Sequence, residues 1–120
     1  MKPTIDSTEF GSITIEGQRF EHDVLIRPSG KIKKRKKKLS KKFYGTSHTI
    51  SQEEAEYIYG KGARELIIGT GQEGNVHLSA EAEDFFREHE CRVTLSPTPE
   101  AITAWNDASL RTAGLFHVTC

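Results

Sequence analysis

Apolar and polar positions alternate over the first quarter of the chain, and this period of two predicts β-strands. Residues 10–27 are typical of a β-hairpin with its turn at 16–18. Phe10, Ile13 and Ile15 precede the turn, and Phe20, His22, Val24 and Ile26 follow it at alternating positions, which suits a half-buried strand. The polar positions between them are Arg19, Glu21, Asp23 and Arg27. A third extended piece begins at Lys31, but Ile32 and Leu39 are its only apolar residues, so little of it can be buried.

From residue 50 the apolar period changes to that of helices separated by short strands. Ser51 and Glu54 form a capping box that begins a helix ending near residue 60 or 62. Ser79 can cap a second helix, and Thr98, followed by Pro99, is placed as the N-cap of a third. A short apolar run after each helix predicts a strand, at 66–68, 93–95 and 115–118.

This alternation of helices and strands predicts right-handed crossover connections. We therefore expect an α/β fold with a mixed, mostly parallel central sheet flanked by helices, and an N-terminal antiparallel β-hairpin region. The 120 residues are expected to form a single domain, 1–120, because cores split only in longer chains.

Targeting signals and cysteine content indicate the cellular compartment of the protein. The sequence has no run of about 18 apolar residues and no secretory or transit signal at its start, so we expect a cytoplasmic protein without a membrane partner. Cys91 and Cys120 lie 29 positions apart, which fits neither a Cys-x-x-Cys motif nor a zinc ribbon. Reduced thiols are therefore favoured over a disulfide.

The net charge of zero, from 17 basic and 17 acidic residues, hides an uneven distribution. Nine basic residues and no acid lie between 31 and 42, so the rest of the chain carries −9. The candidate polyanion-binding residues are Lys33, Lys34, Arg35, Lys36, Lys37, Lys38, Lys41 and Lys42. Phe43 and Tyr44 follow and could stack on bases. The alternative is a solvated edge strand, because edge lysines discourage aggregation.

Residues 69–74 match the GxGxxG pattern of dinucleotide-binding loops. In that motif the third glycine lies in the first turn of a helix, whereas residues 75–78 intervene here before Ser79. The acidic residue expected about 20 positions further on is also missing at 95–97. We therefore expect no cofactor and interpret the motif as a strand-to-helix turn that can approach a ligand.

Histidine and cysteine supply candidate nucleophiles and bases. Cys120 could form a nucleophilic pair with His48 or His117, although His117 and Cys120 would point to opposite faces of a regular strand. The five histidines are scattered without metal-ligand spacing, so no metal site is expected. The carboxylate pairs at 53–54 and 83–84 are expected on exposed faces of first helical turns, where they complement the helix dipole.

Five short motifs follow one another in a specific order. They are Phe10-Gly11-Ser12-Ile13, Tyr44-Gly45-Thr46-Ser47-His48, Ile67-Ile68-Gly69-Thr70-Gly71, Pro97-Thr98-Pro99-Glu100-Ala101 with Trp105-Asn106, and His117-Val118-Thr119-Cys120. In this order the chain resembles domain-of-unknown-function family four-nine-eight over nearly its whole length. The basic segment resembles its archaeal type more than the relatives with a mitochondrial assembly role, and Trp105 departs from the family in standing where many relatives have Tyr.

The resemblance implies a three-layer α/β fold and supplies no reaction, because the family has no established enzymatic activity, cofactor or catalytic residues. Our leading hypothesis is a small binding or assembly-type domain with an unknown protein partner or small ligand, acting as a monomer or weak homodimer. The candidate ligand crevice comprises Thr46, His48, Gly69, Gly71, His117 and Cys120. Nonspecific nucleic-acid association through residues 31–42 and a small-molecule enzyme using Cys120 remain the alternatives.

Overall fold

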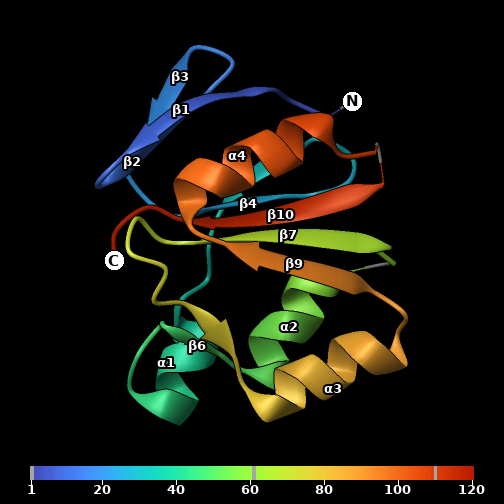
Figure 1. The fold of residues 1–120 in the computed structure, drawn as a ribbon. Coiled ribbons are helices and arrows are strands. Elements are labelled where there is room, and N and C mark those ends of the chain that lie inside the picture. Colours follow the sequence, from blue (N-terminus) through green and yellow to red (C-terminus); the bar gives the residue numbers. More distant parts are fainter. Residues whose placement is uncertain (1, 61, 110) are drawn as a thin grey trace.

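A computed structural model describes residues 2–60, 62–109 and 111–120. A five-stranded sheet with the order β5-β4-β10-β7-β9 runs through the middle of the molecule (Figure 1). Its strands are β4 (Val24–Ile26), β5 (Ile32–Lys34), β7 (Glu65–Thr70), β9 (Arg92–Ser96) and β10 (Thr112–His117). β10, β7 and β9 are parallel, whereas β4 is antiparallel to both β10 and β5. The sheet is therefore mixed, with its parallel part built from the second half of the chain.

Two smaller sheets flank the central one. β1 (Ile5–Glu9), β2 (Ser12–Ile15) and β3 (Gln18–Phe20) form an antiparallel sheet in that order. β6 (Thr49–Ile50) and β8 (His77–Leu78) form a short parallel pair. This pair ties the segment before α2 to the segment before α3.

The helices cover opposite faces of the central sheet (Figure 1). α4 (Thr98–Asp107) packs on one face together with β1, and the buried side chains there include Trp105 and Phe116. α2 (Gln52–Tyr59) and α3 (Ala80–Glu88) pack on the other, around Leu66 and Phe86. The described residues thus form four helices and ten strands, which confirms the mixed α/β class.

The helix starts at residues 51 and 79 follow the predicted capping. Ser51 Oγ accepts a hydrogen bond from the amide of Glu54 at 3.0 Å, and Ser79 Oγ accepts one from Ala82 at 3.1 Å. Each bond satisfies one of the amides that a helix start leaves free. None of the helices in the part of the chain that the structure describes is long and apolar enough to cross a membrane.

The structure corrects three local predictions. The extended segment after Phe20 breaks, so β3 and β4 belong to different sheets and Asp23 between them is buried rather than at an outward polar position. The piece from Lys31 contains a helix, α1 (Lys38–Tyr44), which its low apolar content did not indicate. Thr98 is the first helical residue and not the N-cap, because its hydroxyl is used elsewhere.

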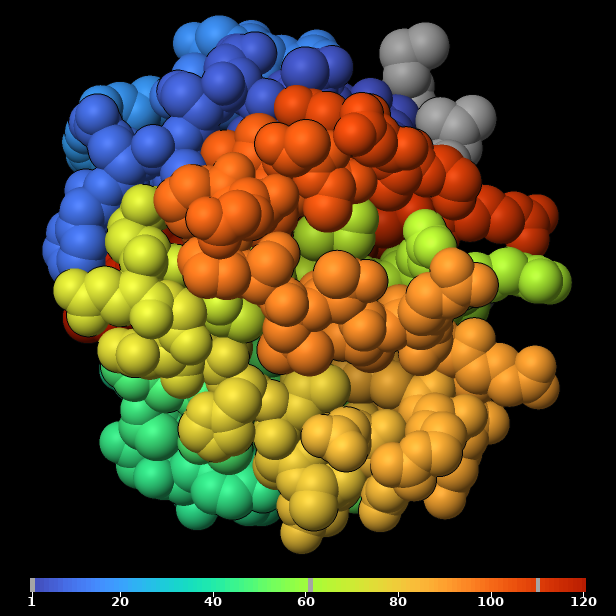
Figure 2. Space-filling model, viewed as in Figure 1, coloured from blue at the N-terminus to red at the C-terminus, as the bar shows by residue number. Residues whose placement is uncertain are grey.

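The loop between β7 and β8 matters for the site. In Figure 2 this yellow-green segment covers the surface between α4 and α1. It begins with Gly71, whose φ of +108° suits glycine, and it lies against the end of the chain. The loop therefore brings the second half of the chain to the end of the sheet where β4 and β10 meet.

Candidate functional site

A buried arginine organises this end of the molecule. Arg35, between β5 and α1, has a side chain only 1% exposed. Its Nε donates to Glu54 Oε2 at 2.7 Å, and its terminal nitrogens donate to Asp23 Oδ2 at 3.0 Å and to the carbonyl of Ser47 at 2.7 Å. Burial lowers the pKa of the guanidinium, but the two carboxylates outweigh this and raise it. Arg35 therefore stays charged and paired, and it is not available to an external polyanion as the sequence suggested.

Asp23 is held by the register of the sheet. Val24 pairs with Phe116 in the antiparallel ladder of β4 and β10, which places Asp23 opposite His117. Its Oδ2 lies 2.7 Å from His117 Nδ1, and its Oδ1 accepts from the amide of Val118 at 2.9 Å. Burial would raise the pKa of Asp23, but the hydrogen bonds from His117 and Val118 and the charge of Arg35 lower it to about 2. The carboxylate is therefore ionised near neutral pH.

Glu54 closes the network from the other side. The expectation of an exposed carboxylate in the first turn of α2 is wrong, because the side chain of Glu54 is 1% exposed and bridges Arg35 to the hydroxyl of Ser40. In a capping box, Glu54 would bond back to the amide of Ser51. Here that amide donates to Ser40 Oγ at 3.0 Å, which leaves Glu54 for Arg35. The network links α1 and α2 to the central sheet.

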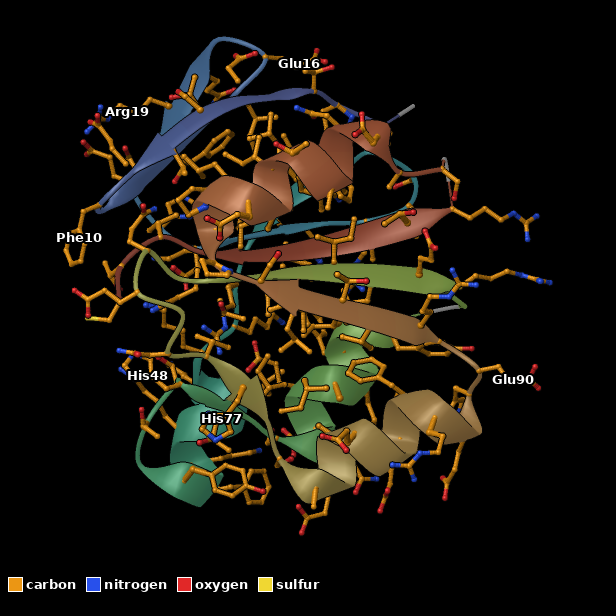
Figure 3. All side chains as sticks on the ribbon, viewed as in Figure 1. Phe10, Glu16, Arg19, His48, His77 and Glu90 are labelled. Atoms are coloured by element: carbon orange, nitrogen blue, oxygen red, sulfur yellow. The ribbon has the colours of Figure 1, made fainter. Side chains whose placement is uncertain are left out.

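Two imidazoles meet beside this network. The ring of His48 contacts the ring of His117 edge to face, with centroids 5.3 Å apart. Burial lowers the pKa of His48, and the nearby charges of His117, Arg35 and Lys37 lower it further. Figure 3 shows His48 on the same side of the molecule as Phe10, which projects from the turn between β1 and β2. His48 is therefore disposed to be neutral near pH 7.

A cavity of about 840 Å³ opens next to the network. Four segments line it, namely Gly11, residues 21–23, residues 34–39 and residues 118–119. Five cationic side chains and two anionic ones lie in this lining, so it has a surplus of three positive charges. We call it the lysine-rimmed cavity, after its lysines, which are Lys34, Lys36, Lys37 and Lys38. Its size suits a small molecule.

The crevice predicted from the sequence is brought together in part. Thr46 Oγ1 accepts from the amide of His48 at 3.1 Å. A Cβ on Gly71 would lie 2.3 Å from the backbone of Cys120 and 2.8 Å from the ring of His117, so these residues are neighbours. Gly69 instead faces Thr98 and Phe116. Close packing against neighbouring residues therefore explains why glycine occupies positions 69 and 71. A ligand role for the six residues stays a prediction.

Both cysteines are free, and they differ in environment. Cys91 is buried below α3, and burial together with the nearby Glu65 raises the pKa of its thiol to about 11. Cys120 is partly exposed, and its carbonyl accepts from the amides of Glu73 and Asn75. Across the residues that the structure describes, His, Cys, Asp and Glu do not gather into a group that could hold a metal ion.

The other predicted basic residues lie mainly at the surface. Lys34, Lys36, Lys38, Lys41 and Lys42 are exposed, and Lys33 and Lys37 are partly so. The Lys33 and Lys36 ammonium groups lie over the ring of Tyr57, and Lys42 pairs with Glu53 at 2.6 Å. Part of the positive charge is therefore engaged within the molecule.

The buried network and the adjoining basic cavity define a small mixed α/β domain with a built polar site at one end of its sheet. The chain belongs to the family described as "Protein of unknown function (DUF498/DUF598)", whose model matches residues 5–111. Curated proteins give no match. The family and its solved relatives establish no catalytic activity.

Solved structures agree with this membership. The conserved hypothetical protein PH1505 from Pyrococcus horikoshii OT3 is 35% identical, with a TM-score of 0.90 over 98% of this chain and 99% of that one. The protein MT938 is 30% identical, with a TM-score of 0.83 over 99% and 100%. A Bordetella parapertussis protein is 18% identical with a TM-score of 0.74 over 98% and 96%, and it shares the fold.

Sequence reasoning missed two members of the site, Asp23 and Glu54, and it named Thr119 only as part of the terminal motif. Asp23 matched a period-two strand, and Glu54 matched a capping box, so each had an ordinary local explanation. One signal was available for Arg35, since it is the only arginine among nine basic residues at 31–42. A planar guanidinium suits a buried site with two carboxylates better than an ammonium does.

Proposed function

We propose that this protein binds a small anionic molecule in the lysine-rimmed cavity, as a binding or assembly-type domain. The observation that carries the proposal is the surplus of three positive charges in a lining of suitable size for a small molecule. Arg35 and Asp23 are already paired with each other inside the protein. The lysines of the lining are at least partly exposed and would attract an anion, while Lys36 also lies over the ring of Tyr57 and Lys37 lies 3.7 Å from Asp23 Oδ2.

Calorimetric titration with pyrophosphate and with citrate tests the proposal. We expect the double variant Lys36→Gln, Lys38→Gln to lower the affinity roughly tenfold, because two screened charge pairs are removed. The matched control is Lys31→Gln, Lys41→Gln, which removes the same charge from the same segment but outside the cavity lining. Equal affinities for both double variants would contradict a ligand in the cavity.

A second candidate is association with nucleic acid through the basic segment 31–42. Its support is the exposure of two aromatic side chains beside Lys41 and Lys42, since Phe43 is 59% exposed and Tyr44 41%. Such rings can stack on bases while lysines contact phosphates. Fluorescence anisotropy with a short single strand at low and moderate salt tests this. A steep salt dependence in the wild type, with a lower affinity but an unchanged salt slope in Phe43→Ala, Tyr44→Ala, supports it, and salt-independent binding counts against it.

For the setting of this function we propose one domain over residues 1–120, working in the cytoplasm as a monomer or weak homodimer. We also propose a three-layer arrangement, with α4, the central sheet, and α2 with α3, joined to an N-terminal β-hairpin region. The two separate buried clusters on the faces of the sheet support these layers. The basic segment and the acidic remainder of the chain would make a weak contact between copies salt-sensitive.

A further inference from the structure

Thr119 joins the buried network to the lysine-rimmed cavity. Its hydroxyl oxygen lies 3.2 Å from His117 Nε2, and Thr119 belongs to the cavity lining. On the other side of the same imidazole, Nδ1 lies 2.7 Å from Asp23 Oδ2. Carboxylate, imidazole and hydroxyl therefore form a continuous chain of two hydrogen bonds. This is the arrangement in which a base activates a hydroxyl nucleophile and a third group orients the base.

The positions of the protons follow from the partners. Asp23 is ionised near neutral pH, so its oxygens only accept, and His117 Nδ1 must donate to it. In the neutral imidazole, Nε2 is then the acceptor. In this neutral form the hydroxyl of Thr119 donates to Nε2 of His117. This tautomer is the one in which Nε2 can take the proton from Thr119 as a general base.

The main chain around this hydroxyl is fixed. The carbonyl of Val118 accepts from the amide of Gly11 at 2.8 Å, and the carbonyl of Thr119 accepts from the amide of Gln72 at 2.7 Å. The carbonyl of His117 accepts from the hydroxyl of Thr98 at 2.6 Å. Three separate segments thus hold residues 117–119 in place. A preorganised nucleophile and base lower the cost of reaching a reactive geometry.

Thr119 is also better placed than Cys120, the nucleophile that the sequence suggested. The described residues show no hydrogen bond between the thiol of Cys120 and the imidazole of His48 or His117. Cys120 is not part of the cavity lining, whereas Thr119 is. The hydroxyl therefore has both the base and the position in the cavity lining that the thiol lacks.

We propose that Thr119 is the nucleophile of an acyl-transfer site that hydrolyses carboxylic esters or thioesters carrying an anionic group. His117 is the general base, and Asp23 is a positioning residue that holds the imidazole. The requirement for an anionic group rests on the proposed function, since the lysines of the cavity supply the positive charge that would attract such a group. Those ammonium groups would also favour the negative charge that develops on the carbonyl oxygen.

The reaction has two balanced halves. Thr119 Oγ1 bonds to the carbonyl carbon while its proton passes to His117 Nε2. The bond to the leaving oxygen or sulfur then breaks, and His117 returns the proton to that atom. In the second half, water attacks the acyl carbon, His117 takes the proton from the water, and the bond to Thr119 breaks. That proton returns to Thr119, so the net change is one ester and one water converted to an acid and an alcohol or thiol.

The test is hydrolysis of 4-nitrophenyl hydrogen succinate, followed by the release of 4-nitrophenolate. We expect Thr119→Val to lower the rate at least about a hundredfold, because it removes the nucleophile and with it the contribution of the base that activates it, while Thr119→Ser keeps activity. Thr103→Val is the matched control, because Thr103 is an exposed threonine on α4. Thermal unfolding of each variant checks that the fold is kept. A Thr119→Val rate equal to that of the wild type would overturn the proposal.

Lysine acylation must be separated from threonine acylation, because activated esters also react with surface amines. Peptide mapping of the quenched protein identifies the labelled residue, and hydroxylamine cleaves a threonine ester but leaves a lysine amide. A hydroxylamine-sensitive label on Thr119 supports the proposal. A label on lysines alone overturns it.

The same assay separates this proposal from the anionic-ligand proposal. The uncharged ester 4-nitrophenyl acetate is compared with the succinate, in the wild type and in Lys36→Gln, Lys38→Gln. If both esters react equally through Thr119, the acyl-transfer site stands and the preference for an anion fails. If pyrophosphate or citrate binds in the cavity but neither ester labels Thr119, ligand binding stands and the acyl-transfer site fails.

Discussion

Replacing Arg35 by methionine tests whether the buried ion network holds the fold together. The substitution keeps a long apolar side chain and removes one cation that two carboxylates share. Asp23 and Glu54, each 1% exposed at the side chain, would then keep their burial and lose this partner. Glu54 would be left with the hydroxyl of Ser40, and Asp23 with His117, Val118 and the ammonium of Lys37 at 3.7 Å. The cost therefore comes mainly from the carboxylates left behind.

The structure sets the size of the effect. Removing one partner of a buried ion pair costs about 3–5 kcal/mol, because an uncompensated charge remains in the interior. For a chain of 120 residues this corresponds to a fall in Tm of roughly 12–20 °C. The pair Arg35→Met with Glu54→Met should cost less than the sum of the two single changes, because the second change removes a charge that the first one stranded.

Urea unfolding followed by far-UV circular dichroism measures these free energies. Lys34→Met is the matched control, since Lys34 is the exposed neighbour of Arg35 and has no buried carboxylate to strand. Its effect should stay within about 0.5 kcal/mol of zero, as for most surface changes. An Arg35→Met variant as stable as Lys34→Met would refute the assignment of the network as a structural element.

Three further outcomes follow from the structure. The pKa of Asp23 falls from 3.8 to about 2 on folding, so its ionised form stabilises the folded protein by about 2 kcal/mol above pH 4. This stabilisation is lost as the pH falls from about 4 to about 2. Acid unfolding curves of Asp23→Asn should therefore lack that part of the pH dependence. Gly71→Ala should lower the free energy of unfolding in urea by about 2 kcal/mol or more, because φ is +108° and the Cβ would meet the backbone of Cys120. The control Gly17→Ala, with φ +82° and open space around the Cβ, should cost about 1 kcal/mol. Equal costs for the two variants would count against the packing argument. A thiol reagent at pH 8 should label Cys120 and spare Cys91, whose buried thiol has a pKa of about 11, and mass mapping that finds both labelled at equal rates would contradict this.

The elements whose signals are local were predictable. The helices beginning after Ser51 and Ser79 carry their own caps, and the apolar run at 66–68 lies in a strand with neighbours on both sides. The helix α1 escaped prediction because it is short and lysine-rich, and because its aromatic residues Phe43 and Tyr44 are exposed, so no amphipathic period is visible. Its place is set by Ser40, which is buried against Ser51 and Glu54.

Some residues of the candidate site could likewise be predicted from the sequence, and others could not. His48 and His117 were predicted to share one crevice, and their rings do meet. Thr119, between two of the predicted residues, belongs to the terminal motif, but the sequence assigns it no chemical role, because a threonine near the end of a strand has no chemical signature of its own. Its proposed activation depends on a base two residues away, which is recognisable only when the backbone directions are known.

By itself, the sequence determined the mixed α/β class, the capped helices and the concentration of positive charge at 31–42, because periodicity, caps and charge are properties of neighbouring residues. Tertiary structure alone decided what happens to the charges. Arg35 meets Asp23 and Glu54 across 12 and 19 positions, and Asp23 meets His117 across 94. The local sequence around each of these side chains would be equally compatible with a position at the surface, where water solvates the charge. The ladder of β4 and β10 and the packing of α2 remove that alternative, and they turn separate charged residues into one buried network beside a cavity.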